Sequence, residues 1–289
     1  ETGDIYSFKR TDKETFSSFD DIIINAKNKN FYQPVGISRD INIDKVSLPS
    51  YFVYPLSGTQ KFYPISSSNP LFSKTDNVFY ANMLSEVLQL FGFNYNSIRR
   101  DTEKDGSVIY VENFSSITIS PSGRAIFTTS QSDGGIALSS LNEEPGETGY
   151  RVQDIIIAAH TFLGMFDSRL TGGADSELRF KTIYFEPETG DCVIDFDYVV
   201  DGIPVLLNGQ NQYAARLKYA NGYFVEADIT FREYTKTQEA FSMMELPSAI
   251  YISRLKRHGR VNLYSYDIVY EDFMNDNLIN PKYLIGFKD

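Results

Sequence analysis

Three aspartates in one apolar stretch, Asp195, Asp197 and Asp201, have a spacing that suggests chemistry. Even spacing along a strand puts side chains on one face, because successive residues point to opposite faces. A row of carboxylates could bind calcium or supply the acid and the base that cleave a glycosidic bond. The other interpretation is a solvated strand face. No calcium-binding DxDxDG loop surrounds the three residues, so we favour the solvated face.

Residues that usually carry nucleophilic or metal chemistry are few. Cys192 is the only cysteine, and its place at the start of an apolar strand favours burial. His160 and His258 are the only histidines, and neither has a His, Cys or Glu neighbour at metal spacing. The chain contains no nucleophile elbow, zinc-protease motif, phosphate-binding loop or dinucleotide fingerprint. We therefore assign no catalytic, cofactor-binding or metal-ligating residue and expect no cofactor.

The elements that must position the aspartates include a long hairpin around Asn221 and Gly222. Apolar and polar residues alternate on both sides of this turn, which is the period of a half-buried strand pair. A three-residue loop over residues 220–222 keeps apolar residues on one face and sets Leu217 against Val225. We predict a type I turn closed by Gly222 in the left-handed region. A two-residue turn would refute it.

The same device predicts a second hairpin earlier in the chain. A three-residue loop over residues 121–123 places Ile119 opposite Ala125 and keeps the apolar residues of both strands on one face. The two hairpins therefore share a loop length and a closing glycine.

Three helices are predicted from apolar residues at helical spacing. The first covers residues 77–91 and is expected to begin at an Asp76 cap, with Tyr80 in its buried stripe. The second covers residues 150–166, and the third covers residues 247–258. Strands follow each helix, so helices packed on antiparallel sheets, the α+β class, are expected.

The order of these elements predicts two duplicated units, each with a helix packed on an antiparallel β-sheet. Residues 142–149 contain Pro145 and two glycines and form the expected junction. The N-terminal α+β domain then covers residues 1–145, with an irregular first part, and the C-terminal domain covers residues 146–289.

Composition limits the classes of partner. The 289 residues carry a formal net charge of -11 and 42% hydrophobic residues, enough for sizeable cores. Nucleic acid and anionic membrane surfaces are unsuitable partners for such an acidic chain. No apolar run reaches the roughly 18–20 residues of a membrane span. The chain starts at Glu1 without a Met, so we expect an upstream signal or anchor to have been removed.

Several short strings in the second half resemble the YycH/YycI family. They combine a strand with the pattern x-x-G-h-P-V, a hairpin, and a helix with Ala-Ile; they lie at residues 196–205, 216–219, 221–222, 231–234, 246–250 and 281–283. The resemblance covers residues 177–287 best and residues 77–141 more loosely. It supplies no catalytic motif, and no family residue role is carried over.

The resemblance implies a non-catalytic, extracytoplasmic regulator in a Gram-positive bacterium. Such a protein is tethered to the outer face of the cell membrane and modulates a membrane sensor histidine kinase of cell-wall homeostasis through protein–protein contacts. A paired family member is a further expected partner.

Two alternatives stay open. A PepSY-like or cystatin-like inhibitor of a secreted peptidase would also suit hairpins packed on helices. An enzyme, a wall-glycan hydrolase, would use a pair of carboxylates from Asp195, Asp197 and Asp201. A cleft that holds two carboxylates, one with a raised pKa, would favour the enzyme.

Overall fold

The protein is described by a computed structural model. The described residues are 32–35, 46–47, 52–55, 61–94, 97–131, 134–141, 150–170, 175–186, 189–207, 213–244, 246–256, 261–274 and 278–288. Two compact units form: the first contains Glu1–Pro64, Gln238–Val269 and Pro281–Asp289, and the second contains Ile65–Thr237 and Tyr270–Asn280. These bounds differ from the predicted domains 1–145 and 146–289. Residues 142–149, the predicted junction, lie outside the described residues, so that division stays a prediction.

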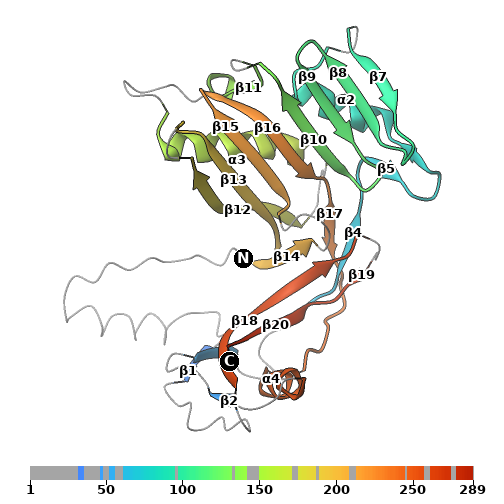
Figure 1. The fold of residues 1–289 in the computed structure, drawn as a ribbon. Helices are drawn as coiled ribbons and strands as arrows, with labels where there is room; N and C mark the ends of the chain where they lie inside the picture. The colour runs from blue at the N-terminus through green and yellow to red at the C-terminus, as the bar shows by residue number, and fades with distance from the viewer. Residues whose placement is uncertain are drawn as a thin grey trace. The chain divides into compact units, whose positions relative to one another are not determined.

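The second unit contains a large sheet that is mostly antiparallel (Figure 1). Its strands are β7 (Arg99–Thr102), β8 (Val108–Glu112), β9 (Ser115–Ile119), β10 (Arg124–Thr129), β11 (Ile136–Ala137), β12 (Ser176–Phe185), β13 (Cys192–Val200), β14 (Ile203–Leu207), β15 (Ala215–Ala220) and β16 (Tyr223–Thr230). They are ordered β14-β13-β15-β16-β10-β9-β8-β7, with β12 paired to β13 and β11 paired to β16. The end of β18 (Val261–Asp272) adds a parallel pairing to β14.

Two helices, α2 (Ala81–Leu90) and α3 (Val152–Leu170), lie on one face of this sheet (Figure 1). Phenylalanines join the layers, because the ring of Phe91 stacks on Phe127 of β10 and meets Phe162 of α3 edge to face. Phe166 of α3 packs against Phe231, which follows β16. Rings in these arrangements add to the free energy gained by burying apolar area. The helices and this sheet face therefore share one core.

The two helices differ in how they begin. The backbone N–H and the guanidinium of Arg151 both donate to the carboxylate of Asp154, so this first-turn acid holds the residue that precedes α3. The prediction that Asp76 caps a helix at residue 77 is wrong. Asp76 instead accepts a hydrogen bond from Ser73, and the helix begins at Ala81 after a short strand, β6 (Val78–Phe79), which pairs with β5 (Phe72–Ser73).

The apolar residues at helical spacing, from which these helices were predicted, are mostly buried. Leu84, Val87 and Leu88 of α2 are buried, and Ile155, Ala159, Phe162, Leu163 and Phe166 of α3 are also buried. Tyr80 and Val152 are exposed, because each lies at or before the first residue of its helix.

The hairpin predicted at residues 121–123 is confirmed. Ala125 lies opposite Ile119, and the N–H of Ser120 donates to the carbonyl of Arg124 at 2.9 Å. Gly123 closes the loop with a φ of +92°, a left-handed conformation that suits glycine.

The hairpin predicted at residues 220–222 has a different turn. Ala220 pairs directly with Tyr223, so the loop has two residues, and both Asn221 (φ +50°) and Gly222 (φ +88°) are left-handed, as in a type I′ turn. The pairing shifts by one residue at Val225, and Leu217 then faces Ala227 rather than Val225. A regular two-residue hairpin would have mixed apolar and polar residues on each face, and this bulge keeps them separate. The requirement that apolar residues share a face is therefore met by either loop, and it predicted the wrong one.

Beside the large sheet, the second unit contains a small sheet of three strands. β4 (Ile65–Ser68) lies between β17 (Glu233–Lys236) and β19 (Leu278–Ile279), and both pairings are antiparallel. A short 3-10 helix, Leu138–Leu141, completes this unit.

In the first unit, β18 pairs in antiparallel fashion with β20 (Lys282–Lys288) and in parallel with β2 (Val46–Ser47). A separate pair joins β1 (Tyr32–Val35) to β3 (Phe52–Pro55). The helix α4 (Leu246–Leu255) packs Leu246 and Ile250 against Leu263 of β18.

The fold is therefore α+β: three α-helices in the described residues with a large, mixed and mostly antiparallel sheet. Within that part of the chain, no helix is long and apolar enough to cross a membrane.

Candidate functional site

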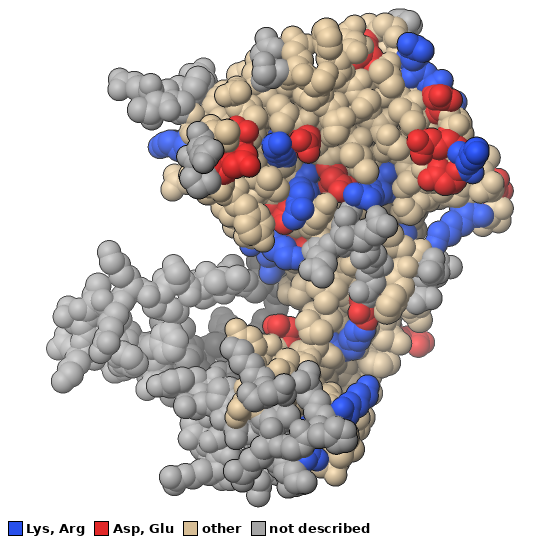
Figure 2. Space-filling model, viewed as in Figure 1, with Lys and Arg blue, Asp and Glu red and all other residues tan. Residues whose placement is uncertain are grey.

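The sheet face opposite α2 and α3 carries the charged side chains of the second unit's central strands. Side chains from β13, β15, β16 and β10 lie next to one another on this face, which we call the open face; its charged members are Asp195, Asp197, Arg216, Lys218, Glu226, Asp228 and Arg124. Figure 2 shows cations and carboxylates interspersed over this side of the unit. Most of these side chains are half-buried or exposed, so the face is polar and accessible.

Asp195 is the most buried carboxylate of the open face, and Arg216 on the neighbouring strand neutralises it. The guanidinium donates two hydrogen bonds, from Nε to Oδ1 and from Nη2 to Oδ2, both 2.7 Å long. The same guanidinium lies 4.0 Å from the ring centroid of Tyr213. Two hydrogen bonds and an aromatic contact fix the position of Arg216.

Asp228 forms a second bidentate pair on the open face. Nε and Nη2 of Arg124 donate to its two carboxylate oxygens at 2.8 Å, and the Tyr213 hydroxyl donates to Oδ2 at the same distance. Burial, followed by the hydrogen bond to this carboxylate, raises the pKa of Tyr213 to about 12. Tyr213 therefore remains a neutral donor and links the two arginine–aspartate pairs.

The remaining pairs of the open face are looser. Lys181 of β12 lies 3.0 Å from Asp197, and Lys218 lies 3.3 Å from Glu226. Burial raises the pKa of Asp197 above its usual value, while the Lys181 ammonium opposes this shift and Asp195 adds to it. Asp197 therefore holds its proton to a higher pH than an ordinary aspartate does.

Asp201 does not join the row that its spacing predicted. It lies with Gly202 in the two-residue turn between β13 and β14, with a φ of +50°, and it pairs with Lys236 of β17. The even spacing fails as a guide here because strand periodicity ends at Val200. Two of the three aspartates thus share a face.

A hollow of about 190 Å³ opens on the open face. Its walls include Val193, Tyr213, Arg216, Lys218, Glu226 and Asp228. The described residues that line it include neither Asp195 nor Asp197, so the predicted carboxylate pair lies outside this hollow. The hollow is therefore not a cleft formed by Asp195 and Asp197.

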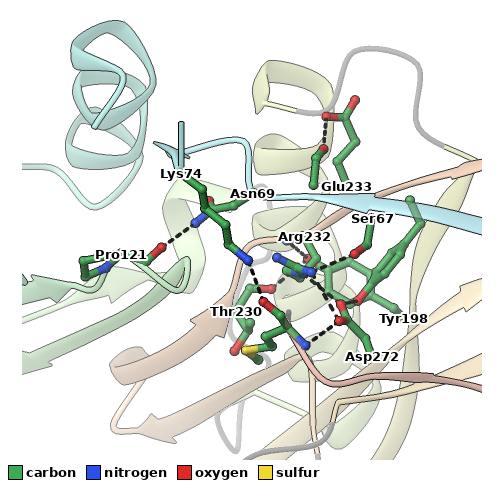
Figure 3. A network of polar contacts seen from close by, with 12 residues as sticks. Ser67, Asn69, Lys74, Pro121, Tyr198, Thr230, Arg232, Glu233 and Asp272 are labelled. Atoms are coloured by element: carbon green, nitrogen blue, oxygen red, sulfur yellow. Dashed lines mark hydrogen bonds and ion pairs between the residues drawn. The ribbon is translucent and has the colours of Figure 1, made fainter. Parts of the chain in front are cut away.

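A second polar group, which we call the buried network, lies inside the second unit (Figure 3). Arg232 donates from Nε and Nη2 to Asp272 at 2.9 and 3.2 Å and from Nη2 to the Ser67 hydroxyl at 2.8 Å. The hydroxyl of Tyr234 donates to Asp272, and the hydroxyl of Tyr198 accepts a hydrogen bond from the Arg232 N–H. The arginine and aspartate side chains are only 3% and 0% exposed, so this network stabilises structure rather than offering a surface.

Sequence reasoning missed both the partners of the aspartates and the buried network. The predicted three-residue loop, which sets Leu217 against Val225, also sets Arg216 against Glu226, whereas Arg216 lies opposite Asp228 in the structure. A signal for the buried network existed in Arg232, a lone arginine between Phe231 and Tyr234 at the end of an apolar strand. Its partner Asp272 lies 40 residues away in the sequence, and no local pattern indicates it.

The other candidate residues lie apart from the open face. Cys192 is buried, as predicted, and burial raises the pKa of its thiol to about 11, which makes a nucleophilic thiolate scarce at neutral pH. His160 is exposed on α3, on the opposite side of the sheet, and His258 lies outside the described residues. In the part of the chain that the structure describes, no group of three or more His, Cys, Asp and Glu side chains could hold a metal ion.

Comparison with known proteins assigns no class to this chain. No protein-family model matches it, and no curated protein matches its sequence significantly.

Proposed function

We propose that this protein acts by binding a protein partner through the open face of its second unit. The observation that carries the proposal is the complete pairing of the aspartates that would otherwise serve as acid and base. Asp195, Asp197 and Asp201 each have a cation within 3.0 Å. Paired carboxylates on a sheet surface suit recognition of another polar surface better than proton transfer.

The composition of the open face supports this proposal. Arginine and tyrosine are the residues that most often anchor protein interfaces, and Tyr213 and Arg216 are held against each other at its centre. A side chain that is already fixed loses less conformational entropy when a partner binds. With Lys181 of β12 included, four cations balance the four carboxylates of the open face, so a partner of either sign can approach despite the formal net charge of -11.

The resemblance to the YycH/YycI family supplies the partner for the proposal. The protein would work outside the cytoplasm, tethered to the outer face of the cell membrane, and would bind a membrane sensor histidine kinase. It would shift the equilibrium between kinase signalling states by binding one of them more tightly. Such a role needs no catalysis and no cofactor.

We also propose that the chain contains two duplicated units, each with a helix packed on an antiparallel β-sheet. Its element order supports this: α2 is followed by four antiparallel strands, β7 to β10, and α3 is followed by strands that include the β15–β16 hairpin. Both series end in a hairpin closed by a left-handed glycine, Gly123 and Gly222.

A hydrolase acting on wall glycan is the second candidate, and one observation favours it. The pKa of Asp197 is raised, and Asp195 lies two residues away on the same strand face. In a retaining glycosidase the two carboxyl groups lie about 5–5.5 Å apart, one protonated and one charged. The bidentate pairing of Asp195 with Arg216, and the position of both Asp195 and Asp197 outside the hollow, argue for the binding role instead.

One experiment in two parts separates the candidates. The full-length protein is crosslinked in the cells that produce it, and the captured proteins are identified; the purified protein is incubated with wall glycan in parallel. Capture of a membrane histidine kinase or of a paired family member, without glycan cleavage, is the expected result. Glycan cleavage that is lost in both Asp195→Asn and Asp197→Asn would overturn the proposal, and capture of a secreted peptidase would replace the kinase by that partner.

A further inference from the structure

The hollow on the open face has walls of opposite charge. Arg216 and Lys218 of β15 form one side, and Glu226 and Asp228 of β16 form the other. The strand register sets Arg216 opposite Asp228 and Lys218 opposite Glu226, so two cations face two carboxylates across the width of one strand pair. A molecule lying in the hollow meets positive charge on one side and negative charge on the other.

The inner half of the hollow, formed by Arg216 and Asp228, is rigid. Arg216 is bound on its far side by Asp195 through two hydrogen bonds of 2.7 Å, and Asp228 is bound by Arg124 through two of 2.8 Å. Tyr213 contacts both walls, through its ring and its hydroxyl. Asp195 lies on β13 and Arg124 lies on β10, the strands that flank the β15–β16 pair, so both inner charges are held from outside that pair whether or not a ligand is bound.

The outer half of the hollow is formed by Lys218 and Glu226, and these side chains can exchange partners. Lys218 and Glu226 make one contact of 3.3 Å, and their side chains are 38% and 52% exposed. An exposed ion pair of this kind contributes little to stability, because water solvates both charges well. A ligand that offers a carboxylate to the lysine and an ammonium to the glutamate replaces one weak ion pair by two.

We propose that the hollow binds a small zwitterion, an α-amino acid or a dipeptide. The carboxylate of the ligand lies toward Arg216 and Lys218, and its ammonium lies toward Glu226 and Asp228. Typical pockets for drug-sized ligands measure about 300–1,000 Å³, and the volume of about 190 Å³ here suits a smaller molecule. Val193 and Ile126 supply apolar wall for a short aliphatic side chain. This inference does not rest on the proposed protein partner.

The test is a titration of the full chain, followed by amide chemical shifts, with four probes at millimolar concentration. L-alanine and L-alanyl-L-alanine carry both charges, N-acetyl-L-alanine lacks the ammonium, and L-alaninamide lacks the carboxylate. We expect at least one zwitterion to shift the resonances of β15 and β16, and both blocked probes to bind about tenfold more weakly or worse. The zwitterion that binds more tightly, L-alanine or L-alanyl-L-alanine, shows whether the ligand is an amino acid or a peptide.

A charge exchange separates binding from folding. The double variant Lys218→Glu and Glu226→Lys keeps the ion pair and the net charge but puts both signs on each wall. We expect zwitterion binding to weaken about tenfold while the urea midpoint stays unchanged. Lys181→Met, which removes a cation of the open face outside the hollow, is the matched control and should bind normally. Equal binding by the charge-exchanged protein, or no shift with either zwitterion, would overturn the proposal.

Discussion

Arg232 and Asp272, which lie 40 residues apart in the chain, form a bidentate ion pair inside the second unit, with side chains 3% and 0% exposed. Asp272 also accepts hydrogen bonds from the Tyr234 hydroxyl and the Met274 N–H. The pair joins the segment after β16 to the end of β18. Burying two charges costs free energy. The additional hydrogen bonds from the surrounding groups are what offset this cost.

Removing one partner of this pair should destabilise the second unit strongly. Arg232→Met leaves a buried carboxylate without its cation, and we expect a loss of about 3–5 kcal/mol in the free energy of unfolding. Urea unfolding monitored by circular dichroism measures it. The double variant Arg232→Met and Asp272→Leu should recover part of the loss, because neither charge is then left unpaired. A loss below about 1 kcal/mol for the single variant would show that the pair is not buried as described.

The turn between β15 and β16 gives a prediction that distinguishes a two-residue loop from a three-residue loop. Asn221 has a φ of +50°, a conformation that costs an ordinary residue about 1–2 kcal/mol. Asn221→Ala should therefore lower the free energy of unfolding by up to about 1–2 kcal/mol, whereas Asn221→Gly should be nearly neutral. In a three-residue loop Asn221 would be right-handed, and alanine would be tolerated as well as asparagine. Thermal unfolding of the two variants decides between them.

The raised pKa of Asp197 predicts how stability depends on pH. The folded protein holds the proton to a higher pH than the unfolded chain, whose carboxyl has the ordinary pKa of 3.8. Between that value and the raised value, the folded state binds more protons, so the contribution of Asp197 to stability falls as pH rises. Asp197→Asn should lack this decline, so the free energy of unfolding of the wild type minus that of the variant should fall as pH rises through the acidic range, measured by urea unfolding. A carboxyl that instead stabilised the fold increasingly with rising pH would contradict the shift.

The ion pairs of the open face should differ in strength. The Arg124–Asp228 pair is bidentate with side chains 30% and 15% exposed, whereas the Lys218–Glu226 pair has one contact and side chains 38% and 52% exposed. Double-mutant cycles with alanine should give about 1 kcal/mol or more of coupling for the first and about 0.2–0.5 kcal/mol for the second. Equal coupling in the two cycles would mean that the bidentate geometry is not maintained in solution.

The local parts of this fold were predictable from the sequence. The apolar stripe of α3 and the loop at residues 121–123 follow from periods of 3.6 and 2, because both depend on neighbours within a few residues. The Asn221-Gly222 turn was predicted wrongly because an extra residue at Val225 shifts the pairing. Residues 223–225 are all apolar, so the shift in alternation is not visible in the sequence there.

The long-range parts were not predictable in this way. The aspartates were visible as a row, but their partners come from other strands: Arg216 follows Asp195 by 21 residues, and Lys181 precedes Asp197 by 16. Which carboxylate is neutralised, and by which cation, depends on strand order and register. The sequence therefore indicated which residues were charged but not whether they were available for chemistry.

Position-specific crosslinking tests most directly whether the open face is the surface that binds a partner. A photoreactive residue is placed at Thr128, exposed on the open face, or at Ile157, exposed on α3 on the opposite side of the sheet, in the full-length protein in its own cells. We predict that Thr128 captures a membrane sensor histidine kinase and that Ile157 does not. Capture from Ile157 alone would contradict the account and would place the binding surface on the helical side.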